Sequence, residues 1–281
     1  MAETIVVHKG HGLPYSKGLM SQALSASGLM PERAFELARI VERRLADRGL
    51  PEIGVAELHD VALEVLADEE GEEVVRRYRD WRRLDRLDRP LVVLIGGTTG
   101  VGKSTLATML AGRLGITRVI ATDVIRQVLR AFFSHDFMPS VHYSAFEAGG
   151  VEGYTEQAAR VATGIEAIVD RAAGERKPVI VEGVHVVPGA VAPALAGRCV
   201  CVEAVLVVAD EERHRGHFAL RGPGRPADRY LAGFDRIRAL QDHLVSQARE
   251  GGVRVIENSN VDQALSSLME LVLDAVGSEV S

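Results

Sequence analysis

Short apolar runs alternate with amphipathic stretches over the last two thirds of the chain. Each run is rich in valine or isoleucine, as in LVVLIGG from Leu91, RVIATD, PVIVEGV, CVCVEAVLVV and VRVIEN. A continuous apolar run suits a strand that is covered on both faces, and strands that alternate with helices form parallel sheets. From Leu91 onward the pattern therefore predicts an α/β fold in which helices wrap a mostly parallel sheet.

The first 88 residues follow another pattern. TIVVHKG predicts a short strand, and helical spacing then takes over. Within PERAFELARIVERRLADRG the apolar positions recur every three or four residues, at Ala34, Leu37, Ala38, Val41 and Leu45. VAELHDVALEVLADEE predicts a second helix, and the charged stretch EEVVRRYRDWRRLDRLDR predicts a solvated connecting helix. We expect a small, mainly helical domain over residues 1–88 and a second domain over residues 89–281.

Composition and charge exclude several classes of protein. The chain has a net charge of -6, which argues against a general nucleic-acid binder because such a protein needs a basic surface. We find no apolar run long enough for a membrane span and no secretory signal, so we expect a cytoplasmic protein. The two cysteines, Cys199 and Cys201, are expected to be reduced core residues on one face of a strand.

GGTTGVGKS carries the strongest chemical signal. Residues 97–104 match the phosphate-binding pattern G-x-x-x-x-G-K-[ST], between a predicted strand and a predicted helix. Glycines let backbone N–H groups surround phosphate oxygens, and the helix N-terminus adds partial positive charge. Lys103 would neutralise the β- and γ-phosphates, and Ser104 would ligate Mg²⁺. The predicted ATP-binding residues here are Gly97, Thr98, Thr99, Gly100, Val101, Gly102, Lys103, Ser104 and Thr105.

A carboxylate follows the second predicted strand of this domain. Asp123 lies at the carboxyl end of that strand, the edge that faces the ligand crevice in doubly wound sheets. There it could accept the proton of an acceptor hydroxyl and orient that hydroxyl towards the γ-phosphate. Asp is also a favoured helix N-cap, so the capping alternative stays open.

Two further candidates lie in PVIVEGVHVVPG. Glu182 ends an apolar strand, and a charge in that position needs a reason, so we expect it to hold a Mg²⁺-bound water near the substrate. His185 could contact the acceptor, although a lone histidine after a strand is more often structural.

An arginine-rich stretch follows the fourth strand. ERHRGHFALRGPGRPADRY surrounds a Gly-Pro-Gly turn with arginines, at positions 213, 215, 221, 225 and 229. A segment of this kind can close over phosphates and stabilise the transferring group, and we predict catalytic roles for Arg221 and Arg225. The alternative is a solvated, mixed-charge helical hairpin.

These motifs together resemble one known family. GGTTGVGKST, TDVIR, VIVEGVHVVPG, and IRALQDHLVSQA followed by VIENSN are similar to archaeal-type 2-phosphoglycerate kinases, and GLPYSKGLMSQALSASGL resembles their ATP-cone-like front domain. The resemblance covers nearly the whole chain. It implies a P-loop kinase that uses ATP and Mg²⁺ to phosphorylate the 3-hydroxyl of 2-phosphoglycerate. By motif position, Lys103 and Ser104 are nucleotide and metal residues, and Asp123 is the base.

Substrate identity is the open part of this inference. Arg126 and Arg130 would suit an acceptor that carries phosphate and carboxylate, and His142 lies in the loop that follows. Asn258, which follows the last predicted strand, is also predicted to bind the nucleotide. The alternatives are a kinase of another small acid or sugar phosphate, or a P-loop NTPase that acts as a regulatory module. The front domain, with Lys9 and Lys17, could hold nucleotide, or it could be structural and mediate a homodimer.

Overall fold

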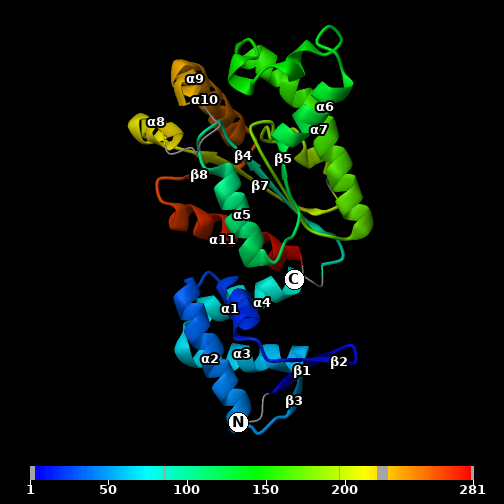
Figure 1. Cartoon of the computed structure of the whole chain (residues 1–281), viewed down its shortest axis with the longest axis vertical. Helices are drawn as coiled ribbons and strands as arrows, with labels where there is room; N and C mark the ends of the chain where they lie inside the picture. The colour runs from blue at the N-terminus through cyan, green and yellow to red at the C-terminus, as the bar shows by residue number, and fades with distance from the viewer. Residues whose placement is uncertain (1–3, 85–86, 196, 220–226, 280–281) are drawn as a thin grey trace. The chain divides into compact units, whose positions relative to one another are not determined.

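The computed structural model describes residues 4–84, 87–195, 197–219 and 227–279 (Figure 1). The chain forms two compact units, one made of residues up to 86 and the other mainly of residues from 87 onward. Within these described ranges, no helix has both the length and the apolar character that a membrane crossing requires.

The N-terminal unit contains a small sheet as well as helices. Strands β1 (Ile5–His8) and β2 (His11–Pro14) form an antiparallel hairpin, and β3 (Glu52–Gly54) pairs with β1 in parallel. The helices are α1 (Lys17–Ser25), α2 (Pro31–Asp47), α3 (Val55–Glu69) and α4 (Glu72–Arg83). The expected strand and helices are confirmed, whereas β2 and β3 were not predicted because they are short and carry few apolar residues.

A stripe of apolar residues on α2 forms the centre of this unit's core. All five predicted positions are buried, namely Ala34, Leu37, Ala38, Val41 and Leu45. Pro31 occupies the first helical turn, where its missing N–H costs no hydrogen bond. The expected charged helix forms, but it is not only a solvated connection. Helix α4 buries Val75 and Tyr78 in the same core, and its arginines form ion pairs on the outer side, as in Arg77–Glu73 and Arg83–Asp80.

The second unit is built on five parallel strands. They are β4 (Leu91–Gly96), β5 (Val119–Ala121), β6 (Val179–Glu182), β7 (Val200–Val207) and β8 (Arg254–Glu257), in the order β5-β6-β4-β7-β8. Each of the five predicted apolar runs forms one of these strands. Residues 91–96 of the central strand β4 are all buried, as expected for a strand covered on both faces.

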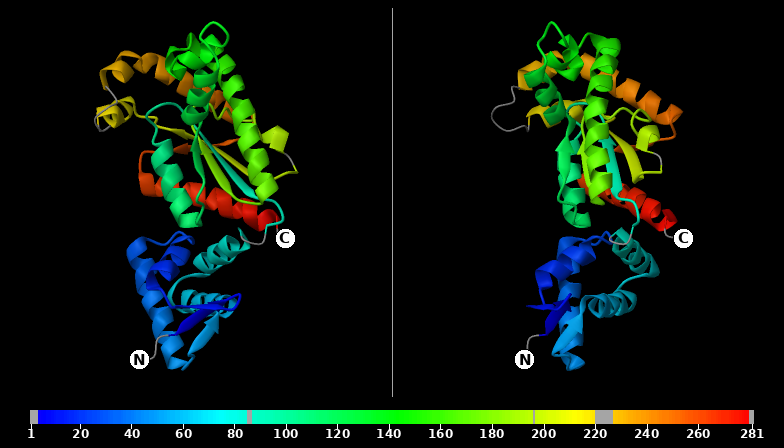
Figure 2. Two further views of the ribbon diagram at one scale, coloured as in Figure 1. Left: turned by 45° about the vertical axis from the view of Figure 1, so that its right-hand side comes forward. Right: turned by 90° about the vertical axis from the view of Figure 1, so that its right-hand side faces the viewer.

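Helices cover both faces of this sheet (Figure 2). Helix α7 (Gly150–Glu175) packs Val161 and Ile165 against Val92 and Leu94 of β4, together with Ile125 of α6 (Thr122–Phe132). Helices α10 (Phe234–Glu250) and α11 (Val261–Glu279) contact β7 and β8. The other helices are α5 (Lys103–Leu114), α8 (Glu211–Ala219) and α9 (Ala227–Ala232), with short 3-10 turns η2 (Pro139–His142), η3 (Ala145–Glu147) and η4 (Ala192–Leu195).

Candidate functional site

The loop between β4 and α5 has a backbone that only glycine accommodates at three points. Gly97, Gly100 and Gly102 have φ angles of 133°, 95° and 87°. A Cβ on Gly97 would lie 2.4 Å from the Leu206 carbonyl oxygen, and one on Gly102 would lie 2.4 Å from Nδ2 of Asn258. The glycines therefore let the loop curve tightly against its surroundings, which is what a phosphate-binding loop requires.

Lys103 and Ser104 open α5 directly after this loop. Lys103 Nζ donates a hydrogen bond to the Thr98 carbonyl at 2.8 Å, across the mouth of the loop. Ser104 Oγ donates to Oε1 of Glu182 at 2.8 Å. Glu182 ends β6 and is buried. A hydroxyl and a carboxylate in contact are hard oxygen donors of the kind Mg²⁺ prefers, so these two side chains fit the predicted metal.

A cavity of about 320 Å³ lies over the carboxyl ends of the strands. It is lined by residues of four segments, namely Thr99, Gly100, Lys103 and Ser104; Ala121, Asp123, Val124 and Arg126; Ser144, Ala145 and Phe146; and Glu182, Gly183 and Val184, together with Tyr230. A small ligand in this cavity would contact the phosphate-binding loop on one side and α6 on the other. Both partners of a group transfer could therefore bind in one place.

Asp123 lies in the first turn of α6 without capping the helix. The N-cap position belongs to Ala121, and no side chain caps this helix, so the capping alternative for Asp123 was wrong. The Asp123 side chain is 70% exposed, and its Oδ1 accepts a hydrogen bond from Arg126 Nε at 3.2 Å. Nη1 of Arg126 donates to the carbonyls of Val141 and Tyr143 at 3.0 and 3.1 Å. Arg126 is thus held in place while it lines the cavity.

Two histidines of α8 contact the back of the phosphate-binding loop. Nε2 of His214 lies 2.9 Å from the Thr99 carbonyl oxygen, and Nδ1 of His217 lies 2.8 Å from the Gly100 carbonyl oxygen. A carbonyl accepts only, so in each case the ring nitrogen carries the proton and donates it. Burial lowers the pKa of His214 to about 4, which keeps its imidazole neutral at pH 7.

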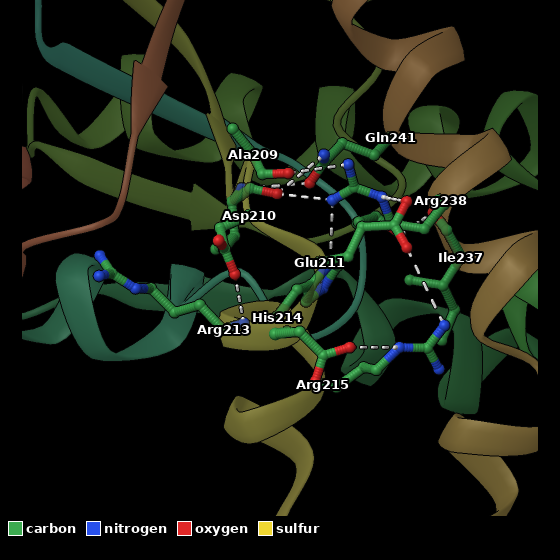
Figure 3. A network of polar contacts seen from close by, with 12 residues as sticks. Ala209, Asp210, Glu211, Arg213, His214, Arg215, Ile237, Arg238 and Gln241 are labelled. Atoms are coloured by element: carbon green, nitrogen blue, oxygen red, sulfur yellow. Dashed lines mark hydrogen bonds and ion pairs between the residues drawn. The ribbon is translucent and has the colours of Figure 1, made fainter.

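Arg238 connects His214 to the segment after β7 (Figure 3). Its guanidinium donates to the carbonyls of Val208 and Ala209 at 2.6 and 3.1 Å, and it approaches Nδ1 of His214 at 3.5 Å. Gln241, one turn further along α10, makes a second pair of bonds with Val208. The network fixes α8 and α10 relative to the loop that follows β4.

Two family models match most of this chain. The family model described as "AAA domain" matches residues 92–244, and the one described as "ATP cone domain" matches residues 4–87. A 2-phosphoglycerate kinase of Methanopyrus kandleri is 34% identical, over 95% of this chain and 86% of that protein. The 2-phosphoglycerate kinase of Pyrococcus horikoshii is 35% identical, over 95% of this chain and 93% of that protein. The chain belongs to the 2-phosphoglycerate kinase family.

Among solved structures, the chain is similar to a shikimate kinase from Acinetobacter baumannii in complex with shikimate. The sequences are 20% identical, the match covers 71% of this chain and 97% of that one, and the TM-score is 0.42. The second unit is an α/β P-loop kinase fold with a parallel five-stranded sheet, as the sequence predicted.

Several predicted residues of this 2-phosphoglycerate kinase family member meet at the cavity. They are Lys103 and Ser104 from the nucleotide side, Asp123 and Arg126 from the acceptor side, and Glu182 between them. Arg221 and Arg225 lie outside the described residues. The three described arginines of that stretch are engaged elsewhere. Arg213 donates to the Ser259 carbonyl, Arg215 lies over the Phe234 ring, and Arg229 pairs with Glu147.

Three predicted substrate residues do not line the cavity. His185 is buried, with its ring nitrogens 2.9 Å from Thr122 Oγ1 and 2.8 Å from Gln157 Oε1, so it has no surface to offer an acceptor. Arg130 is exposed on α6, one helical turn after Arg126, and is not among the residues that line the cavity. His142 bonds to the Phe133 carbonyl at 3.0 Å and packs against His135. Burial thus argues against substrate contact for His185, while Arg130 and His142 lie outside the cavity lining.

Asn258 lies against the phosphate-binding loop. Its Nδ2 donates to the Val101 carbonyl at 2.9 Å, and its Oδ1 is buried without a hydrogen-bond partner among the described residues. Thr98 is buried and its hydroxyl donates to the Ile237 carbonyl at 3.3 Å, whereas Thr105 is exposed on α5. Asn258 thus contacts the loop and Thr98 ties the loop to α10, and neither lines the cavity.

Sequence reasoning missed other residues at or behind the cavity. Ser144, Phe146 and Tyr230 line it, and His214 and His217 support the loop from behind. The spacing of the two histidines, three residues apart in a helical stretch, was the available signal. It placed them on one helix face without showing what that face contacts.

Proposed function

We propose that this protein is an ATP-dependent kinase that converts 2-phosphoglycerate to 2,3-bisphosphoglycerate. One observation carries the proposal beyond family membership: the phosphate-binding loop, the carboxylate of Asp123 and the guanidinium of Arg126 line a single cavity. A volume of about 320 Å³ suits a small acceptor beside the terminal phosphates of ATP, which is the arrangement that direct phosphoryl transfer needs.

The nucleotide side is supplied by α5 and the loop before it. Lys103 is expected to leave the Thr98 carbonyl and neutralise the β- and γ-phosphates, because an ammonium gains more from phosphate oxygens than from one neutral carbonyl. Backbone N–H groups of residues 97–104 bind the remaining phosphate oxygens.

Ser104 and Glu182 are the residues that would hold Mg²⁺. The buried Glu182 carboxylate contacts the Ser104 hydroxyl, and no group of three or more His, Cys, Asp or Glu suited to a metal occurs among the described residues. That is compatible with Mg²⁺, which takes few protein ligands and completes its shell with water and nucleotide phosphates. When bound, the ion would neutralise charge on the transferring phosphoryl group.

The acceptor side is supplied by α6. Asp123 accepts the proton of the acceptor hydroxyl while the hydroxyl oxygen bonds to the γ-phosphorus and the bond from that phosphorus to ADP breaks. Arg126 offers a positive charge beside Asp123 for an anionic group of the acceptor. Arg221 and Arg225 are proposed to stabilise the transferring group, as arginines of a closing segment do.

The N-terminal unit is proposed to be a module of its own, with its boundary at residues 88 and 89. Lys9 lies in the turn between β1 and β2, and Lys17 begins α1 and pairs with Glu42 at 2.8 Å. These positions support two roles, binding of nucleotide and formation of a homodimer. The number of ATP molecules bound per chain tests the first role, because a second nucleotide requires a second site, and the sedimentation coefficient of the full chain tests the second.

Product analysis tests the kinase proposal. The purified chain is incubated with ATP, Mg²⁺ and equal concentrations of 2-phosphoglycerate, 3-phosphoglycerate, glycerate and several sugar phosphates. We expect 2-phosphoglycerate to be the best acceptor and Lys103→Ala to abolish transfer in a folded protein. Near-normal turnover by folded Lys103→Ala would refute the assignment of the phosphate-binding loop.

A further inference from the structure

Three buried polar side chains form a continuous hydrogen-bond chain behind the acceptor side of the cavity. Thr122, Gln157 and His185 have exposed fractions of 0%, 0% and 1%. They come from the start of α6, from α7 and from the segment after β6. The Thr122 hydroxyl lies 2.9 Å from His185 Nδ1, and His185 Nε2 lies 2.8 Å from Gln157 Oε1. None of the three lines the cavity itself.

The donor and acceptor of each of these hydrogen bonds can be assigned by starting from Gln157. Gln157 Nε2 lies 2.5 Å from the Ser140 carbonyl oxygen and 3.1 Å from the Tyr143 carbonyl oxygen. Both partners accept only, so the amide nitrogen must point to them and Oε1 must accept from His185. The histidine therefore carries its proton on Nε2, and its Nδ1 accepts the Thr122 hydroxyl proton. Burial lowers the pKa of His185 to about 4, which agrees with a neutral ring.

One of the carbonyl groups that bind Gln157 also holds Arg126 in place. The Tyr143 carbonyl accepts from Gln157 and from Arg126 Nη1, at 3.1 Å in each case. Residues 144–146, which directly follow Tyr143, line the cavity opposite the phosphate-binding loop. Displacement of the 140–143 carbonyls would therefore move both the Arg126 guanidinium and one wall of the cavity.

At the other end of this hydrogen-bond series, Thr122 contacts Gly183, which lines the cavity. Thr122 precedes Asp123, and a Cβ on Gly183 would lie 1.8 Å from Thr122 Oγ1. The hydroxyl thus packs directly on the backbone of a cavity-lining residue. Glycine is required at position 183 for the Thr122–His185 bond to form.

We propose that Gln157 and His185 are positioning residues for the phosphoryl acceptor, acting through Arg126 and the 140–146 segment. The inference rests on the proposed kinase function, because it takes this side of the cavity to be the acceptor side. The nucleotide side has its own supports from α8, α10 and Asn258. Loss of the buried chain should therefore weaken the binding of acceptor and leave the binding of ATP unchanged.

The first test is Gln157→Met, which keeps the length of the side chain and removes its donors and acceptor. Two hydrogen bonds to carbonyls are lost, and we expect the KM for the acceptor to rise about tenfold or more. The KM for ATP should stay within about twofold of wild type. Gln127→Met on the exposed face of α6 is the matched control and should change neither constant. Should Gln157→Met fail to fold, Thr122→Val removes only the first donor of the chain and is measured instead.

The second test removes the hydrogen bonds of the two His185 ring nitrogens one at a time. His185→Gln places an amide N–H near the position of Nε2 and keeps the bond to Gln157, whereas His185→Asn places an oxygen near Nδ1 and keeps only the bond to Thr122. We expect His185→Gln to retain most acceptor affinity and His185→Asn to lose about tenfold. If both variants lower thermal stability and leave the acceptor KM unchanged, the residues are merely structural and the proposal is overturned.

A third measurement needs no acceptor. The ¹⁵N shifts of the His185 imidazole in the wild-type protein should show Nε2 protonated and Nδ1 unprotonated between about pH 5 and about pH 8. A protonated Nδ1 in that range would overturn the hydrogen-bond directions assigned to Thr122, His185 and Gln157. If 2-phosphoglycerate proves inactive and another acceptor is used, the KM comparison is made with that acceptor. Failure of the proposed substrate is thereby distinguished from failure of this inference.

Discussion

Asp123 and Gly102 show what single residues contribute to this site. Asp123 keeps an exposed carboxylate in the first turn of a helix, at the edge of a cavity that also receives the phosphate-binding loop. Gly102 has a φ of 87° at the N-cap of α5 and leaves no room for a side chain beside Asn258. The first residue serves the chemistry, and the second keeps the loop in shape.

Replacement of Asp123 by Asn should separate chemistry from binding. An amide cannot accept the proton of the acceptor hydroxyl, so turnover should fall by roughly 10² or more. The affinity for ATP and the melting temperature should change little, because Asp123 does not cap α6 and is largely exposed. Steady-state kinetics with calorimetric ATP titration measures both. Unchanged turnover would place the base elsewhere.

Replacement of Gly102 by Ala should abolish ATP binding. The new Cβ would lie 2.4 Å from Asn258 Nδ2 in a backbone conformation that disfavours alanine, so the loop must distort. Gly112→Ala in the same helix is the control, since a Cβ there meets nothing within 4 Å and should be neutral or slightly stabilising. Equal ATP affinities for the two variants would contradict the loop geometry.

Residue types and spacing were enough to predict the phosphate-binding loop, Asp123 and Glu182 as site residues. They did not show which of the other candidate side chains are buried. His185 follows a strand that ends at the cavity, and from sequence it is equivalent to an acceptor ligand. In the fold its ring is enclosed between Thr122 and Gln157, which are 63 and 28 residues away along the chain. Arg130 shares a helix face with Arg126 but lies one turn further along α6, and spacing alone does not say how far along the helix the cavity extends.

At the scale of elements, α8 is more than one flank of an arginine-rich hairpin. Its two histidines donate to successive carbonyls of the phosphate-binding loop, and Phe218 stacks on Tyr230 of α9, which lines the cavity, at 5.3 Å. Helices α8 and α9 thus both contact residues of the site. The sequence predicted helices here and could not show these contacts, because each joins segments far apart in the chain.

Removal of one α8 contact should affect the nucleotide more than the acceptor. His217→Ala deletes the 2.8 Å bond to the Gly100 carbonyl, and we expect the KM for ATP to rise about fivefold to tenfold. The acceptor KM should stay near the wild-type value. Glu212→Ala on the exposed face of the same helix is the control. A larger rise in the acceptor KM than in the ATP KM would contradict this role.

At the scale of the whole molecule, the apolar pattern predicted the parallel sheet well because its inner strands β4, β6 and β7 are largely buried, and the partly exposed edge strands β5 and β8 still carry short apolar runs. The order β5-β6-β4-β7-β8 did not follow from that pattern, since pairing is decided by long-range contacts. The N-terminal sheet was underestimated for the opposite reason. HGLP and EIG are short, and their side chains are mostly exposed, so no periodicity marks them as strands.

Acid should destabilise the kinase unit through its buried histidines. Burial lowers the pKa of His185 and His214 to about 4, against about 6.5 in the unfolded chain. Between these values the unfolded state binds more protons, so stability is fully present above about pH 6.5 and is lost as pH falls towards 4. Each histidine contributes a slope of about 1.4 kcal/mol per pH unit in that window.

Urea unfolding of wild type and His185→Gln, from about pH 7 to about pH 5, measures this effect. The variant lacks one titrating group, so its stability should fall less steeply with acid by about the slope of one histidine. Gln127→Met, which removes no titrating group, is the control and should keep the wild-type slope. Identical slopes for His185→Gln and wild type would show that His185 is not held neutral by the fold.

We propose that this cavity transfers the γ-phosphoryl group of ATP to the free hydroxyl of 2-phosphoglycerate. ³¹P NMR of the reaction with ATP and 2-phosphoglycerate follows both substrates and locates the new phosphate ester directly. We predict that ADP and 2,3-bisphosphoglycerate appear in equal amounts, and that neither appears with Lys103→Ala. Unchanged 2-phosphoglycerate would contradict this reaction, whether ATP is hydrolysed to inorganic phosphate or a nucleoside or an uncharged alcohol takes up the phosphoryl group.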